Sequence, residues 1–266
     1  MPTVSIGDVR LNVVEEGSGR PLLFVHGFPL DHTMWRAQIE HFANTHRVIA
    51  PDLRGFGGSD VTEGTVGMEQ FADDLGALLT ELEVTEPVSF CGLSMGGYIA
   101  WQFFERHRDR LGSLILCDTR AEADTEEAQS TRHGLAAKVL KEGPDFIART
   151  MPAKLFSTRT REERPDIVDT VQAVIRSTSP AGIAAAARGM AERPDATGLL
   201  PQIDLPALLI VGEEDAISTV DEMLEIATRM PAAEFKVIEA AGHMAPLEDP
   251  AAVNSAIETF LLDNAY

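Results

Sequence analysis

A serine enclosed by glycines, in Gly92-Leu93-Ser94-Met95-Gly96, is the part of the sequence best suited to covalent chemistry. The Gly-x-Ser-x-Gly spacing is typical of a serine on a sharp turn between a strand and a helix, where its Oγ is exposed at the top of a sheet. An apolar run over residues 87–91 precedes the motif, and a segment with one broad apolar face, residues 98–107, follows it. The sequence therefore predicts that Ser94 is a nucleophile. The alternative is a serine in an ordinary glycine-rich turn.

A serine hydroxyl is a weak nucleophile, so it needs a base, and the base needs a carboxylate to orient it. His243 is the candidate base because it stands in a loop after the last predicted strand, although such a histidine can also simply bond locally. Asp215 follows another apolar run and is the candidate acid. Asp118 also ends an apolar run and is its rival, because both carboxylates could reach the same imidazole. His32 is the second choice for a histidine in the pocket.

The oxyanion formed by attack on a carbonyl needs two backbone N–H donors near the serine. Met95, directly after Ser94, is one candidate donor. Phe28, in the turn His26-Gly27-Phe28-Pro29, is the other. We expect His26 to brace this turn by hydrogen bonding rather than to take part in catalysis.

The elements that position these residues alternate between strands and helices. After an expected hairpin over residues 3–15, continuous apolar runs predict strands buried on both faces. These runs are residues 21–26, 46–51, 87–91, 111–117 and 205–212. Helical segments of ordinary length separate most of them, which indicates right-handed parallel crossovers and an α/β fold.

This alternation stops between residues 120 and 201, where the pattern predicts only helices. A long helical insertion in an α/β pattern is expected to form a lid over the site. The predicted organisation is a core of residues 1–119 and 202–266 with a helical cap of residues 120–201.

The pocket is expected between the sheet and this cap. Phe28, Trp35 and Met95 are candidates for its floor, and Met151, Phe156 and Met190 for its roof, with simple core packing as the alternative for the roof residues. Arg120 follows a strand end, where a guanidinium could pair with a substrate carboxylate; a surface salt bridge is its other possible role.

Composition narrows the class of protein. The 266 residues are 44% hydrophobic and carry a formal net charge of −20, which argues against binding to nucleic acid phosphates.

No apolar run approaches the length of a membrane span, and no signal peptide is seen at the start. The only cysteines, Cys91 and Cys117, each end an apolar run and are expected to be reduced core residues. A cytoplasmic monomer or small homo-oligomer is expected.

Five motifs in order resemble the α/β-hydrolase superfamily. They are His26-Gly27-Phe28-Pro29, residues 52–59, residues 92–97, residues 212–215 and residues 242–250. The resemblance implies a mostly parallel eight-stranded sheet flanked by helices with a helical cap, a triad in the order Ser94, Asp215 and His243, and no metal or organic cofactor. Residues 117–124 resemble the branch that contains 3-oxoadipate enol-lactonases, cofactor-free haloperoxidases and related esterases. Ser94 stands where haloalkane dehalogenases and epoxide hydrolases carry an aspartate, which disfavours those reactions.

The predicted function is a serine hydrolase that cleaves a small carboxylic ester or lactone through an acyl-enzyme. Three alternatives stay open: hydrolysis of a carbon–carbon bond in a β-diketone-type substrate, perhydrolysis, and a non-catalytic ligand receptor on the same fold.

Overall fold

The computed structural model describes residues 3–264 and contains one eight-stranded sheet. Its strands are β1 (Thr3–Ile6), β2 (Val9–Glu16), β3 (Pro21–Val25), β4 (Arg47–Pro51), β5 (Val88–Leu93), β6 (Leu111–Cys117), β7 (Ala207–Gly212) and β8 (Ala233–Ile238). They lie in the order β1-β2-β4-β3-β5-β6-β7-β8. The pairs β1–β2 and β2–β4 are antiparallel, and every other pair is parallel. The predicted fold class, a mostly parallel eight-stranded α/β sheet, is confirmed.

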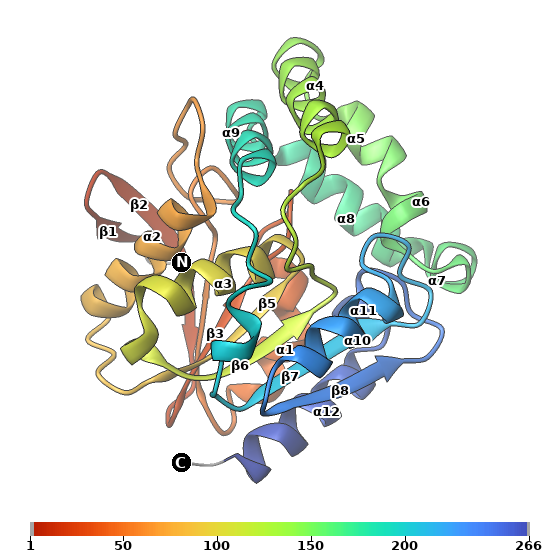
Figure 1. Ribbon diagram of the computed structural model, residues 1–266. Coiled ribbons are helices and arrows are strands. Elements are labelled where there is room, and N and C mark those ends of the chain that lie inside the picture. The colour runs from red at the N-terminus through yellow and green to blue at the C-terminus, as the bar shows by residue number, and fades with distance from the viewer. Residues whose placement is uncertain (1–2, 265–266) are drawn as a thin grey trace.

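Helices cover both faces of this sheet (Figure 1). One face packs against α2 (Met68–Glu81), α3 (Met95–Arg106) and α10 (Val220–Arg229). The other face packs against α1 (Arg36–Phe42) and α12 (Pro250–Asp263). The central strands β3, β5, β6 and β7 are therefore buried along their whole length, which explains their unbroken apolar sequences.

Short elements complete the chain between these layers. They are the 3₁₀ helices η1 (His32–Trp35), η2 (Arg108–Arg110) and η3 (Leu200–Gln202), and the short helix α11 (Ala245–Glu248). Among residues 3–264 no helix is both long and apolar enough to cross a bilayer. Cys91 and Cys117 lie on the neighbouring strands β5 and β6, and both are buried free thiols, as expected.

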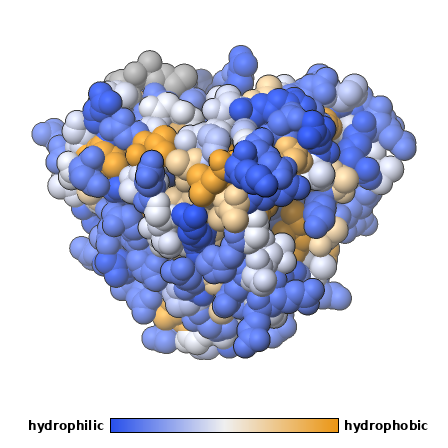
Figure 2. Space-filling model, turned by 90° about the horizontal axis from the view of Figure 1, so that it is seen from above, coloured by the Kyte–Doolittle hydropathy of each residue, from blue (hydrophilic) through white to orange (hydrophobic). Residues whose placement is uncertain are grey.

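A group of α-helices follows one after another between β6 and β7. The helices are α4 (Glu126–Glu142), α5 (Asp145–Thr150), α6 (Pro152–Leu155), α7 (Thr158–Glu163), α8 (Pro165–Ser177) and α9 (Pro180–Ala191). Figure 1 shows α4, α5 and α9 above the sheet and α6 to α8 beside them. Seen from above, this side of the molecule is mostly hydrophilic, with hydrophobic side chains gathered in small patches (Figure 2).

Close backbone contacts hold helix α9 against the loop between β4 and α2. A Cβ on Gly182 would lie 2.0 Å from the carbonyl oxygen of Gly55, and one on Gly189 would lie 1.8 Å from that of Val66. The Val66 N–H also donates to the Ala185 carbonyl at 3.2 Å. Glycine at these two helix positions lets the backbones meet, so α9 has a fixed place above the sheet.

Candidate active site

Ser94 occupies the turn between β5 and α3 in a conformation that non-glycine residues rarely adopt. Its φ is 52° and its ψ is −108°. A Cβ on Gly92 would lie 2.6 Å from the Gly96 carbonyl oxygen, and one on Gly96 would lie 2.4 Å from the Val25 carbonyl oxygen. The two glycines are therefore required for the strand and helix to come this close. Strained backbone of this kind is characteristic of functional sites, and Ser94 is the only residue from 91 to 100 that is not fully buried.

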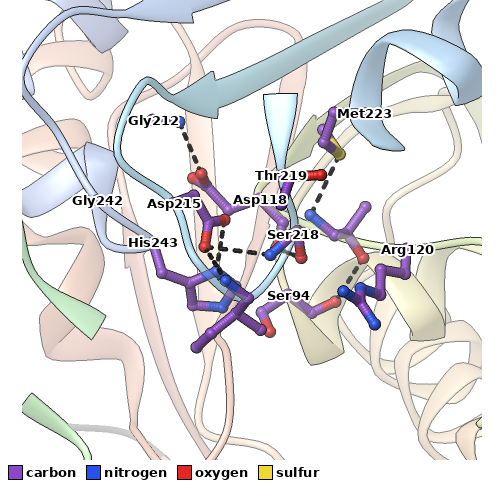
Figure 3. Close-up of polar contacts among 12 residues, drawn as sticks. Ser94, Asp118, Arg120, Gly212, Asp215, Ser218, Thr219, Met223, Gly242 and His243 are labelled. Atoms are coloured by element: carbon purple, nitrogen blue, oxygen red, sulfur yellow. Dashed lines mark hydrogen bonds and ion pairs between the residues drawn. The ribbon is translucent and has the colours of Figure 1, made fainter. Parts of the chain in front are cut away.

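The carboxyl ends of neighbouring parallel strands bring the polar partners to the same edge of the sheet. His243 follows β8, Asp215 follows β7, and Asp118 follows β6 directly. The His243 Nδ1–H donates to Asp215 Oδ2 at 2.8 Å, and both side chains are buried. Figure 3 shows these two side chains directed toward each other, with Ser94 next to the imidazole. His243 and Ser94 line one cavity.

Asp215 is held by donors on both of its oxygens. Besides the imidazole on Oδ2, its Oδ1 accepts from the N–H groups of Ile217 (2.7 Å) and Ser218 (3.1 Å). These donors compensate for burial of the charge and fix the carboxylate under His243. Asp215, the residue predicted as the acid, thus makes the hydrogen bonds that suit a carboxylate orienting an imidazole.

Asp118 lies beside Asp215 but does not take the same role. One carboxylate oxygen of Asp118, one of Asp215 and one ring nitrogen of His243 all lie within 4.8 Å of one another. Asp118 Oδ1 accepts from the Gly212 N–H at 2.8 Å, while its buried Oδ2 accepts no hydrogen bond from the described residues. Burial and the adjacent Asp215 carboxylate raise the pKa of Asp118 well above its ordinary value. Loss of the Asp118 proton is therefore disfavoured in the folded protein, which distinguishes this carboxyl from the fully hydrogen-bonded Asp215.

Two backbone N–H groups near Ser94 are available for an oxyanion. Among the described residues, the N–H groups of Phe28 and Met95 have no hydrogen-bond acceptor. The Phe28 turn is braced by His26, whose Nδ1–H donates to the Gly27 carbonyl at 3.0 Å and whose Nε2 accepts from the Leu53 N–H at 2.9 Å. Burial lowers the pKa of His26, so the ring stays neutral and keeps both bonds.

The loop carrying His243 is tied to the helical insertion. Glu248 Oε1 accepts from the Gly242 N–H at 2.8 Å, and its Oε2 accepts from the Ser157 N–H at 2.9 Å. The Met244 N–H donates to the Leu155 carbonyl at 3.1 Å. The position of the imidazole therefore depends on the segment between α6 and α7.

The cavity above Ser94, called the Ser94 cavity below, has a volume of about 540 Å³. It lies between the sheet edge and the helical insertion. Its lining includes three residues predicted for the pocket, Phe28, Met151 and Met190. Its other lining residues, besides Ser94 and His243, are Tyr98, Thr125, Glu127, Ala128, Thr131, Arg132, Leu135, Lys154, Leu155, Ala187 and Ile217.

Two of the residues predicted to bind substrate, Trp35 and Arg120, do not line this cavity. Trp35 is fully buried in the core, with its ring centroid 5.0 Å from that of Phe24. Arg120 pairs with Glu222 at 2.8 Å, on the outside of α10. The position of the Arg120 side chain depends on Glu222 of α10, and the residues around Arg120 in the sequence do not reveal this contact. This ion pair is the surface salt bridge that is the other possible role of Arg120.

Phe156 and Met95 are also absent from the cavity lining. Phe156 is buried in the core on the α1 and α12 side of the sheet, and Met95 is buried in the core on the other side. The expected role of Met95 as an oxyanion donor involves only its backbone, which this burial leaves unchanged.

His32, the second choice for a pocket histidine, lies away from the cavity. Its backbone N–H and its Nδ1 both donate to Asp52 Oδ1, at 2.9 and 2.6 Å. Burial opposes the charge on Asp52, but its hydrogen bonds from His32 and Gly58 lower its pKa to about 2. The pair anchors the segment after β4.

Two groups among the described residues have ligand atoms close enough to share a metal ion: Asp31, His32 and Asp52, and Asp118, Asp215 and His243. In both groups the imidazole already donates to a carboxylate of its own group. The arrangement matches a hydrogen-bonded relay better than a set of free ligands.

Comparison with known proteins agrees with this geometry. The family model described as alpha/beta hydrolase fold matches residues 20–250. The chain belongs to this family, so the expected family and fold are confirmed.

Individual relatives cover almost the whole chain. The chain is 30% identical over 261 residues to 3-oxoadipate enol-lactonase 2 of Acinetobacter baylyi, covering 97% of this chain and 96% of that one. Among solved structures, a thermophilic esterase from Thermogutta terrifontis, with malate bound, is 45% identical with a TM-score of 0.98, and both chains are covered completely. The enol-lactonase from Burkholderia xenovorans is 26% identical with a TM-score of 0.92, covering 98% of this chain and 100% of that one.

Proposed function

We propose that the protein hydrolyses a small carboxylic ester or lactone, with Ser94 as nucleophile, His243 as base and Asp215 as the orienting acid. The observation that carries the proposal is the position of Ser94. Its strained turn faces the same cavity as His243, whose other ring nitrogen bonds to Asp215. The full-length similarity to an enol-lactonase and an esterase supports the same substrate class.

In the first half of the reaction, His243 Nε2 takes the proton of Ser94 Oγ as the oxygen attacks the carbonyl carbon. The carbonyl oxygen becomes an oxyanion, which the N–H groups of Phe28 and Met95 stabilise. The carbon–oxygen bond to the leaving group then breaks, and His243 gives its proton to the departing alcohol or enol oxygen.

In the second half, His243 takes a proton from water, and the resulting hydroxide attacks the acyl-enzyme. The bond to Ser94 Oγ breaks, Ser94 regains a proton from His243, and the carboxylic acid leaves. Asp215 keeps Nδ1–H of the imidazole directed toward itself, so that Nε2 faces Ser94 in both halves.

We also propose that residues 120–201 act as a cap on a core formed by residues 1–119 and 202–266. The support for this division is that helices α4, α6 and α9 supply much of the cavity lining while the reacting groups come from the sheet edge. Substrate selection would then belong to the cap and bond cleavage to the core.

Covalent labelling tests the proposal. A fluorophosphonate should add one phosphonyl group to the wild-type protein and none to Ser94→Ala, as read by intact mass. Ser255→Ala, an exposed serine on α12, is the matched control and should label like the wild type. Ester and lactone hydrolysis, followed by acid release, should fall by roughly 10³-fold or more in Ser94→Ala because the nucleophile is lost. A folded wild-type protein that does not label would indicate a binding protein instead.

A further inference from the structure

A cation held in a fixed orientation lines the Ser94 cavity. Arg132, on α4, is among the lining residues, and its side chain is 26% exposed. Its Nε donates to Asp124 Oδ2, and its Nη1 donates to Met190 Sδ at 3.4 Å. Its Nη2 has no hydrogen-bond acceptor among the described residues. The guanidinium is thus immobilised while one nitrogen keeps its donors free.

The acid that holds Arg132 is already neutralised by a second cation. Asp124 Oδ1 accepts from Arg193 Nη1 at 2.5 Å, and the Arg193 side chain is only 5% exposed. Arg193 also donates to the carbonyl groups of Met190 and Glu122, and it lies over the Tyr98 ring at 4.2 Å. Two guanidinium groups therefore share one carboxylate, and the cluster of Asp124, Arg132 and Arg193 carries one surplus positive charge.

The remaining charges of the cavity do not cancel this surplus. Glu127 and Lys154 also line the cavity, but they have opposite signs and both are exposed to solvent, where their fields are screened. The whole chain carries a net charge of −20, so a positive cavity is not a consequence of its composition. A surplus cation inside an acidic protein selects for an anion at that position.

We propose that Arg132 binds a carboxylate carried by the substrate, so that the preferred substrate is an ester or lactone with a second, ionised carboxyl group. This inference rests on the proposed function of Ser94. The free nitrogen of Arg132 supplies the charged donors, and a guanidinium matches the planar geometry of a carboxylate. The apolar lining of the cavity suits the hydrocarbon chain of the substrate between its two carbonyl carbons. The apolar lining residues are Phe28, Leu135, Met151, Leu155, Met190 and Ile217.

The test compares esters that differ only in charge. The substrates are the methyl monoesters of succinic, glutaric and adipic acids. Each is paired with the same methyl ester in which the free carboxyl group is replaced by a carboxamide, which has the same shape but no charge. The wild type should prefer the acids. In Arg132→Met, kcat/KM for the acids should fall roughly 10- to 100-fold, as expected for loss of a charge-assisted hydrogen bond, while the amides change less than about threefold. Arg132→Lys should recover part of the loss.

Lys138→Met is the matched control. Lys138 is exposed on the same helix, lies over the Phe146 ring and does not line the cavity, so its removal takes away one positive charge without touching the proposed site. It should leave the preference for acids unchanged. A purely structural role of Arg132 would instead lower the rates of acids and amides together.

A second readout does not depend on turnover. Free glutarate or adipate should protect Ser94 of the wild type from fluorophosphonate labelling, and should protect Arg132→Met much less. Labelling without preferential acid hydrolysis or protection would overturn the inference and leave the proposed function intact. A selective loss in Lys154→Met but not in Arg132→Met would overturn the assignment to Arg132. Failure of Ser94 to label would overturn the proposed function itself.

Discussion

The pair of carboxylates beneath His243 leads to a prediction about stability. Asp118 is fully buried, receives one hydrogen bond on Oδ1 and none on Oδ2 from the described residues, and faces Asp215. Burial and the neighbouring carboxylate raise its pKa well above the ordinary value of 3.8, so the folded protein holds this proton more tightly than the unfolded chain does. Asparagine has the shape of a protonated aspartate, so Asp118→Asn should preserve the site.

The magnitude follows from the protons bound in each state. Between the ordinary value of 3.8 and the raised pKa of the folded state, the unfolded chain has lost the Asp118 proton while the folded protein still holds it. A raised pKa in the folded state means that stability is greatest at low pH and falls as pH rises toward the folded pKa. Each pH unit in this window costs the wild type about 1.4 kcal/mol that Asp118→Asn does not lose. The stability of the variant relative to the wild type should therefore rise by that amount per unit.

Urea unfolding at pH 5, 6 and 7 measures this difference directly. Asp169→Asn, which removes an exposed carboxylate from α8, controls for the loss of a negative charge and should show no comparable slope. In the same buffers, Asp118→Asn should retain ester hydrolysis within about tenfold, whereas Asp215→Asn should lose roughly 10⁴-fold, as expected when the orienting acid is replaced. A stability difference that is independent of pH would show that Asp118 is ionised, and the reasoning would be refuted.

Two further substitutions test the supports of the site. Glu248→Ala removes the acceptor for the Gly242 and Ser157 N–H groups, so kcat should fall about tenfold or more and the free energy of unfolding by about 1–3 kcal/mol; unchanged kinetics would show that the His243 loop holds its place without Glu248. Asp52→Asn turns an amide donor toward the donors of His32 and Gly58, so the free energy of unfolding should fall by about 3–5 kcal/mol at pH 7. Because the pKa of Asp52 is lowered to about 2, that loss should shrink as the pH falls from about 4 toward 2, and a constant loss would contradict it.

Most of the sheet could be predicted because its strands are buried on both faces and therefore have unbroken apolar sequences. Helix α10 also has a recognisable start in the sequence, because Thr219 and Glu222 form a capping box there. The strand-end residues Ser94, Asp215 and His243 could be found for a related reason. Parallel strands place their carboxyl ends at one edge, so order along the chain already indicates proximity in space.

The substrate cavity could not be predicted in the same way. Its lining depends on how α4 lies on α9, and α4 has no strongly apolar face that would reveal its orientation. Arg120 follows a strand end, a position that favours a contact with substrate, but its side chain pairs with Glu222. The sequence around Arg132, which lies in α4, gives no signal that this residue lines the cavity. Its role depends on Asp124 and on Arg193, which comes 61 residues later, and only the folded structure brings the three together.

The link between the helical insertion and the His243 loop has a consequence for how the enzyme can change its substrate. A Cβ on Gly242 would lie 2.7 Å from the Ser157 nitrogen, Glu248 accepts from the Ser157 N–H, and Met244 donates to the carbonyl of Leu155 at the end of α6. Substitutions in α6 or α7 that reshape the cavity will therefore also move the imidazole, and should alter kcat together with KM. Arg132 lies on α4, and its hydrogen bonds lead to Asp124 and α9 rather than to the His243 loop. The α4 side of the cavity is thus where substrate preference can change while the reacting groups stay in place.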